Sequence, residues 1–169
     1  MRDQLLTLKD GRQLAITVSG PESGVPLIYH HGTPGCRLQS RALQAMTAQH
    51  GLRLVTYDRA GAGQSSRNPG RTVADVASDM AGVLDALDAP RCVVAGKSGG
   101  GPHALATAAG LPDRVAAVAS LAGVAPYGEG FLDGMGQDNH DEFGLALEGE
   151  AALRPYLEHH REVLLTADA

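Results

Sequence analysis

The stretch VVAGKSGGGPHALATAAG, residues 93–110, decides the fold of this chain. Its apolar start has the composition of a buried strand, and its alanine-rich end has that of a helix. Between them, the glycine-rich segment GKSGG at 96–100 marks a sharp turn. We therefore predict a strand over 91–96, a helix over 100–109, and Ser98 at the turn that joins them.

The segment GKSGG fits the pattern G-x-S-x-G. On a strand-to-helix turn, this pattern holds the serine in a strained backbone conformation and exposes its hydroxyl above the sheet. The N-terminus of the following helix favours negative charge at the same place. These properties predict that Ser98 is a nucleophile; the simpler interpretation is a serine in an ordinary turn.

Two phosphate-binding motifs are alternative interpretations of this loop. A Walker A loop needs a glycine five residues before the Gly96-Lys97 pair, and the chain has Arg91 there. A dinucleotide-binding fingerprint would open the first β-α unit of the chain, whereas this loop lies in a later one. The sequence therefore argues against both.

The rest of the first 125 residues alternates between predicted strands and helices. A hairpin turns at Asp10-Gly11 near the N-terminus. Apolar runs predict further buried strands, and periodic apolar residues predict helices, over these ranges: strands 25–31, 52–58 and 114–123, and helices 38–50 and from Thr72 onward. This order indicates an α/β fold with a mostly parallel sheet and helices on both faces.

Two loops of this α/β region have compositions that suit an acyl-transfer site. HHGTPG at 30–35 follows a predicted central strand, and a glycine-rich loop there can present an N–H group to an oxyanion. DRAGAGQS at 58–65 has no nucleophile or metal-ligand spacing, so we expect it to brace neighbouring loops through hydrogen bonds.

Together, these three motifs resemble the α/β-hydrolase family, in its esterase and proline-iminopeptidase-like branch. The resemblance covers 1–125, the N-terminal part of that fold. It implies that Ser98 is the nucleophile and that the backbone N–H groups of Thr33 and Gly99 are the oxyanion donors. It also implies that the pair His31-Gly32 is structural. A serine at the nucleophile position argues against the dehalogenase and epoxide-hydrolase branches.

Residues 126–169 are expected to be the beginning of a helical cap or lid. They show no further strand, and their last part has an apolar stripe at helical spacing, made up of Leu153, Tyr156, Leu157, His160, Val163 and Leu164. In the family, the triad acid and histidine follow the nucleophile. We therefore expect the chain to be truncated at the C-terminal side, and the triad acid and histidine to be absent from it.

Several other side chains are of types that act as catalytic or metal-binding groups. His103 is expected to face solvent or to pack locally, and His159 and His160 to lie on a helix face. His140 with Asp138 and Asp141 could be taken for a metal site, but neighbours in sequence point in different directions, so no metal site is predicted. A compact triad of Ser98 and His140 with Asp133 or Asp138 stays open. Three further side chains are not expected to react. We expect Lys97 to point away from the site, Cys36 to line the pocket, and Cys92 to be a small buried hydrophobic residue.

Composition and charge indicate which kinds of partner and which location to expect. The chain has 169 residues and a formal net charge of −5 at pH 7 without a basic cluster, so nucleic acid is not expected as a partner. It has no apolar run typical of a signal peptide or a membrane span, so a cytoplasmic location without membrane attachment is expected. A disulfide between its two cysteines is not favoured, and no cofactor is predicted.

The sequence thus predicts a serine hydrolase acting on an ester, amide or related acyl bond of a small molecule, weakly active or inactive as this chain. The alternative is a non-catalytic, hydrolase-like scaffold that binds a ligand or pairs with a partner. In that case the open sheet edge would support self-association or bind a complementing chain.

Overall fold

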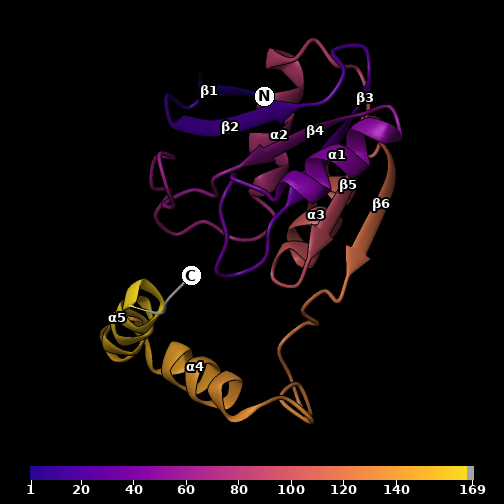
Figure 1. Ribbon diagram of the computed structural model, residues 1–169. Coiled ribbons are helices and arrows are strands. Elements are labelled where there is room, and N and C mark those ends of the chain that lie inside the picture. The colour runs from indigo at the N-terminus through magenta and orange to yellow at the C-terminus, as the bar shows by residue number, and fades with distance from the viewer. Residues whose placement is uncertain (167–169) are drawn as a thin grey trace. The chain divides into compact units, whose positions relative to one another are not determined.

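The computed structural model describes residues 1–166 of the chain (Figure 1). The chain divides into two compact units, Met1–Ala125 and Pro126–Ala169. The first unit is an α/β sheet structure and the second is helical. Each unit is described by itself.

The first unit contains one six-stranded sheet in the order β1-β2-β4-β3-β5-β6. β1 and β2 form an antiparallel hairpin, and β2 pairs antiparallel with β4. The remaining pairs, β4 with β3, β3 with β5 and β5 with β6, are parallel. The predicted mostly parallel sheet with an N-terminal hairpin is confirmed. The strands are β1 (Arg2–Thr7), β2 (Gln13–Ser19), β3 (Val25–His30), β4 (Leu52–Tyr57), β5 (Cys92–Lys97) and β6 (Val115–Leu121).

Helices cover both faces of this sheet, as predicted. Helix α1 (Arg41–Gln49) lies on one face, and α2 (Val76–Ala86) and α3 (Gly100–Gly110) lie on the other (Figure 1). The hydrophobic core forms on the α2 and α3 side. There, apolar side chains of the sheet meet those of α2 and α3, with Leu14, Ile16, Ile28, Val55, Tyr57, Met80, Val83, Leu84 and Ala104 among the most buried.

Helix α2 begins later than the sequence predicted. We expected a helix from Thr72, with Asp75 completing a capping box. The Asp75 carboxylate does accept the Thr72 N–H, at 2.6 Å, but the Thr72 hydroxyl also donates to that carboxylate, at 2.9 Å. The first N–H groups of the helix have no side-chain cap, and a turn at residues 74 and 75 precedes α2, which starts at Val76.

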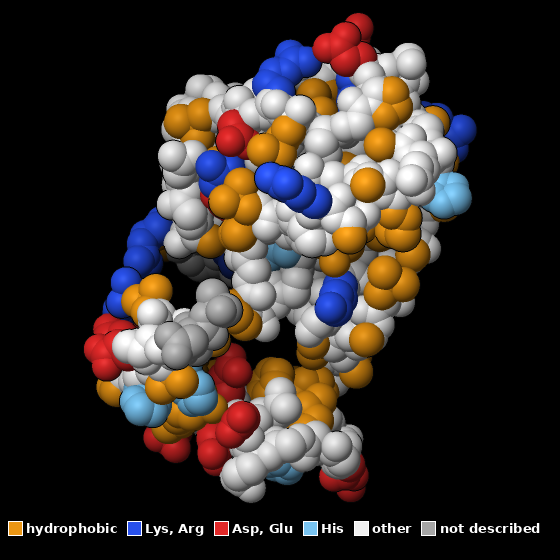
Figure 2. Space-filling view, in the orientation of Figure 1, with side chains coloured by type: hydrophobic (Ala, Val, Ile, Leu, Met, Phe, Trp, Pro, Cys, Tyr) orange, Lys and Arg blue, Asp and Glu red, His pale blue; other side chains and the backbone are white. Residues whose placement is uncertain are grey.

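Strand β6 was predicted to be buried, and this prediction is wrong. It lies at the edge of the sheet, and all its residues after Val115 are exposed. Val118 and Leu121 keep 40% and 52% of their surface in contact with solvent. Apolar side chains are visible along this edge in Figure 2. An apolar composition on both faces predicted a buried strand. The sequence does not show that β6 is the last strand of the sheet, with a neighbouring strand on one side only.

The second unit contains two helices, α4 (Gln137–Glu148) and α5 (Glu150–Thr166). As predicted, no strand occurs between residues 126 and 166. Ahead of α4, Tyr127 and Phe131 pack with Phe143 of α4, with ring centroids 4.9–6.5 Å apart. None of the helices in residues 1–166 combines the length and apolar character that a membrane span requires.

Candidate active site

Ser98 lies at the junction between β5 and α3, where the sequence placed it. Its backbone has φ +52°, a conformation that residues other than glycine rarely adopt. Hydrogen bonds hold it there: the Ser98 N–H donates to the Leu121 carbonyl at 3.0 Å, and the Ser98 carbonyl accepts from Gly101 N–H at 2.8 Å. A half-buried serine in this conformation matches the strained strand-to-helix turn that the sequence predicted.

The glycine-rich loop after β3 packs directly on this turn. A Cβ placed on Gly32 would lie 3.4 Å from the Ser98 Cβ and 3.9 Å from its Oγ. A Cβ placed on Gly99 would lie 3.5 Å from the Thr33 backbone nitrogen. The structure therefore brings Ser98 together with the two residues, Thr33 and Gly99, whose N–H groups were predicted as oxyanion donors.

Arg59, two residues after the end of β4, connects these two loops. Its Nη2 donates to the Gly32 carbonyl at 2.5 Å and to Thr33 Oγ1 at 2.9 Å. Its Nη1 donates to the Gly99 carbonyl at 3.3 Å. Burial lowers the pKa of Arg59. One guanidinium thus holds both the loop after β3 and the turn that carries Ser98.

Asp58 fastens the same segment on its other side. Its fully buried carboxylate accepts from Arg37 N–H at 2.9 Å, from Arg37 Nη1 at 2.6 Å and from Gln64 N–H at 3.2 Å. Its carbonyl accepts the Ser65 hydroxyl at 2.7 Å. The prediction that DRAGAGQS braces its neighbours through hydrogen bonds is confirmed.

Two buried histidines bind the same carbonyls as Arg59. His31 Nδ1 lies 2.8 Å from the Gly32 oxygen, and His103 Nδ1 lies 3.0 Å from the Gly99 oxygen. Their Nε2 atoms are buried without a hydrogen-bond partner. Burial lowers the pKa of both rings, that of His103 to about 4. His103 therefore packs locally, and the alternative that it faces solvent is wrong: it lies on the side of α3 that faces the sheet, together with Ala104 and Thr107.

A third histidine, His30, is part of a buried hydrogen-bond chain. The Thr107 hydroxyl donates to the His103 carbonyl at 2.9 Å, so it accepts from His30 Nε2–H at 3.2 Å. His30 Nδ1 then accepts the Tyr57 hydroxyl at 2.7 Å. Burial lowers the pKa of His30 to about 3. Both ring nitrogens are occupied, so His30 links β3, β4 and α3 as a neutral structural group.

The remaining candidate residues of the sequence make none of these hydrogen bonds. In the first unit, Lys97 and Cys36 are exposed, Cys92 is buried as predicted, and both cysteines are free. In the second unit, His140 and the three aspartates near it, Asp133, Asp138 and Asp141, are exposed. His159 is exposed and His160 packs on Tyr156, with ring centroids 4.3 Å apart. Within residues 1–166, no three His, Cys, Asp or Glu side chains are grouped so that they could hold a metal ion.

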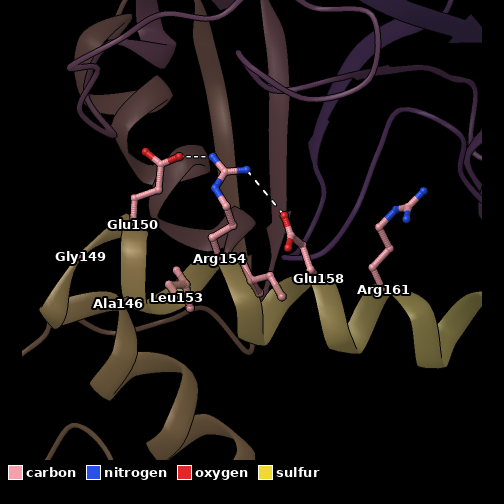
Figure 3. A pocket seen from close by; sticks show the side chains of 8 residues that line it. Ala146, Gly149, Glu150, Leu153, Arg154, Glu158 and Arg161 are labelled. Carbon is pink, nitrogen blue, oxygen red and sulfur yellow. Dashed lines mark hydrogen bonds and ion pairs between the residues drawn. The ribbon is translucent and has the colours of Figure 1, made fainter.

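The second unit carries an open groove of about 460 Å³ on α4 and α5 (Figure 3). Its apolar lining comes from Ala146, Leu153 and Leu157. Arg154 lies at its rim between Glu150 and Glu158 and forms ion pairs with both. The predicted apolar stripe of α5 is thus present, and Leu157, Val163 and Leu164 on it are largely exposed.

Arg59 has no individual role among the predictions from sequence, and His103 is expected there only to face solvent or to pack locally, although both contact the loops around Ser98. Two signals point to them. Arg59 follows β4, and β4 is the neighbour of β3, so residues after these strands meet at the same edge of the sheet. His103 lies four residues after Gly99 and four before Thr107, which is the spacing of one helix face.

The sequence of this chain is similar to those of known proteins. A family model described as alpha/beta hydrolase fold matches residues 25–157. The chain is similar to a non-heme chloroperoxidase of Streptomyces lividans, with 32% identity over 152 residues, 87% of this chain and 55% of that protein. It is also similar to a 3-oxoadipate enol-lactonase of Acinetobacter baylyi, with 31% identity over 103 residues, 60% of this chain and 38% of that protein.

Among solved structures, an alpha/beta hydrolase fold protein from Nakamurella multipartita superposes with a TM-score of 0.67 and 30% identity, covering 83% of this chain and 47% of that one. A hydrolase from Pseudomonas aeruginosa gives a TM-score of 0.70 at 24% identity, covering 99% of this chain and 68% of that one. The chain spans about half the length of the sequence relatives that it matches over most of its residues.

Proposed function

The chain belongs to the α/β-hydrolase family, and from this premise we propose that it is the nucleophile-bearing part of a serine hydrolase for a small-molecule ester, amide or related acyl bond. The observation that carries this proposal is the position of Ser98, at φ +52° between β5 and α3, with Gly32 and Thr33 packed against the turn. Relatives that are hydrolases and a lactonase support hydrolytic chemistry in general.

In the proposed reaction, Ser98 Oγ attacks the acyl carbonyl carbon and the carbonyl oxygen becomes an oxyanion. The N–H groups of Thr33 and Gly99 bind that oxygen. Collapse of the tetrahedral intermediate releases the alcohol or amine and leaves an acyl-enzyme, which water then hydrolyses. A general base must take the Ser98 proton and then give it to the leaving alcohol or amine. None of the described residues, 1–166, is assigned as triad acid or histidine, so we propose that the chain alone turns over slowly or not at all.

The three buried histidines of the first unit are unsuited to the role of general base. Burial lowers the pKa of the His31, His103 and His30 rings, and His30 also has both ring nitrogens engaged in hydrogen bonds. A general base works best with a pKa near the working pH.

The proposal is tested by intact-mass measurement after incubation with a fluorophosphonate. We expect a single adduct on the unaltered chain and on Ser78→Ala, a change of an exposed serine of α2, and none on Ser98→Ala. An adduct that persists in Ser98→Ala would contradict the assignment of Ser98 as nucleophile. No adduct on a chain shown to be folded by circular dichroism would favour the non-catalytic scaffold.

A second candidate function rests on the exposed β6 edge. We propose as the alternative a non-catalytic scaffold that pairs through this edge, because β6 is apolar on both faces and exposes Val118 and Leu121. Sedimentation velocity distinguishes the two functions: the scaffold predicts concentration-dependent dimers or a complementing chain at β6, and a monomer at all concentrations counts against it.

A further inference from the structure

Two backbone carbonyls beside Ser98 are each bound by two donors of the same kinds. The Gly32 carbonyl is contacted by Arg59 Nη2 and His31 Nδ1, and the Gly99 carbonyl by Arg59 Nη1 and His103 Nδ1. A carbonyl oxygen has two lone pairs, so both oxygens are fully used. On both loops, therefore, the carbonyl oxygen binds one histidine and the same arginine. The hydrogen bonds of Asp58 do not explain this arrangement, because they go to Arg37, Gln64 and Ser65.

The hydrogen-bond network fixes the ring forms that this arrangement requires. Arg59 Nη2 has two hydrogens, and the two shortest of its contacts are the oxygens of Gly32 and Thr33. His31 Nδ1 therefore carries its proton and donates it to Gly32 rather than accepting from Arg59. His103 Nδ1 donates to Gly99 in the same way. Both rings are neutral, since burial lowers the pKa of each.

The Gly32 carbonyl belongs to the same peptide group as the Thr33 N–H. In a trans peptide, the C=O and N–H point in opposite directions. A cation that pulls on the oxygen therefore fixes the direction of the N–H on the far side and withdraws electron density from it. The Thr33 nitrogen lies 3.5 Å from the position that a Cβ on Gly99 would take, so this peptide is next to the turn that carries Ser98.

We propose that Arg59 is a positioning residue that orients and polarises the Gly32–Thr33 peptide, so that the Thr33 N–H is a stronger and better-aimed donor to an oxyanion on Ser98. This inference rests on the proposed serine hydrolase function. Arg59 does not touch the reacting atoms. It acts through the peptide that it binds, and His31 supports it at the same oxygen.

Lysine cannot replace this arginine. The guanidinium reaches Gly32 and Thr33 through one nitrogen and Gly99 through another, in a fixed planar fork. A lysine ammonium is a single point charge and would bind one loop or the other. The expected order of oxyanion stabilisation is therefore arginine, then lysine, then alanine.

The test compares Arg59→Ala and Arg59→Lys with Arg114→Ala. Arg114 is a matched control because its guanidinium also donates to two backbone carbonyls, those of Ala89 and Pro90, at 2.8 Å each. It lies before β6, at the opposite end of the sheet from Ser98. Three readouts are taken on full-length chain: the rate of fluorophosphonate labelling of Ser98, the ¹³C chemical shift of the Gly32 carbonyl, and the thermal unfolding midpoint.

We expect Arg59→Ala to label on the order of tenfold more slowly than Arg114→Ala, a smaller loss than the complete removal of an oxyanion donor causes. Arg59→Lys should fall between them. Millimolar guanidinium chloride should restore part of the rate in Arg59→Ala and change nothing in Arg114→Ala. The Gly32 carbonyl resonance should move upfield in Arg59→Ala alone, because the carbonyl loses a charged donor.

Equal labelling rates in Arg59→Ala and Arg114→Ala would overturn the inference, as would an unchanged Gly32 carbonyl shift. If the unaltered chain is not labelled at all, the proposed function falls. The Gly32 carbonyl shift, which needs no reaction at Ser98, then decides whether Arg59 polarises the peptide. The unfolding midpoint shows whether a slow variant is simply unfolded.

Discussion

The carbonyl oxygen of His30 occupies the space in which a side chain on Gly100 would place its Cβ, and the carbonyl of His31 lies 2.7 Å from the same point. Helix α3 therefore starts in direct contact with the end of β3. This contact requires a residue without a side chain at position 100. It also sets how closely the turn with Ser98 approaches the loop that carries Thr33.

Gly100→Ala is expected to destabilise the fold by at least about 3 kcal/mol, because the two obstructing atoms are backbone and cannot rotate away. Gly144→Ala in α4 is the matched control: nothing lies within 4 Å of its added Cβ, and alanine is the better helix former by about 1 kcal/mol. Urea unfolding of both variants measures the difference. Equal midpoints would show that α3 can move away from β3 at little cost.

The buried histidines predict a loss of stability in mild acid. The pKa of His103 is lowered to about 4 and that of His30 to about 3, both by burial, from an ordinary value of 6.5. Between these limits the unfolded chain binds protons that the folded chain does not, so stability rises with pH and is lost as pH falls from about 6.5 to 4. His103, whose pKa is lowered to about 4, contributes to this loss over the upper part of that range.

His103→Gln removes one of these titrating groups. We expect its stability to fall less steeply between pH 6.5 and 4 than that of the unaltered chain, even if it starts lower at neutral pH. His50→Gln changes an exposed histidine at the end of α1 and should keep the original slope. Denaturant midpoints at a series of pH values test this, and parallel curves for His103→Gln and the unaltered chain would disprove it.

An ion pair between Arg12 and Asp79 joins the N-terminal hairpin to α2. Arg12 Nη2 lies 2.6 Å from Asp79 Oδ1, and both side chains are largely buried. Asp79→Asn leaves the largely buried charge of the Arg12 guanidinium without an opposite charge beside it at Asp79. We expect it to lower the free energy of unfolding by about 2–4 kcal/mol. Glu22→Gln at the exposed pair with Arg2 should cost less than about 1 kcal/mol. Thermal unfolding distinguishes them; similar losses would mean that burial does not strengthen the Arg12 contact.

Val118→Lys tests the edge strand. Because Val118 is 40% exposed, a lysine can extend into solvent without loss of the core. If β6 pairs with another copy, the charge should shift the sedimentation distribution toward monomer, since charged residues on an edge oppose strand addition. Lys97→Ala, an exposed change at the end of β5, should leave the distribution unchanged. Unchanged association in Val118→Lys would exclude β6 as the interface.

Sequence patterns predicted most of the first unit, because each of its elements has a local signal. Apolar runs gave the strands, helical periodicity gave the helices, and GKSGG gave the turn with Ser98. What they missed depends on long-range placement. The exposure of β6 follows from its place in the sheet. Helix α2 starts at Val76 without a side-chain cap, although the contact between Thr72 and Asp75 is formed.

The candidate site likewise has a part that local sequence signals predict and a part that depends on contacts between distant residues. Ser98, Thr33 and Gly99 belong to motifs that can be read along the chain. The contacts of Arg59 cannot, because its carbonyl partners lie 27 and 40 residues away in sequence and have no side chain to mark them. Burial of His103 beside Thr107 also became evident only once α3 had been placed on the sheet.

The aromatic cluster of the second unit has a spectroscopic consequence. The chain has no tryptophan and two phenylalanines, and both of these, Phe131 and Phe143, pack with each other and with Tyr127. Phenylalanine signals in near-ultraviolet circular dichroism or ¹⁹F resonance after fluorophenylalanine incorporation therefore report on residues after Ala125 alone. The melting of the helical unit can be followed in the intact chain without cutting it from the sheet.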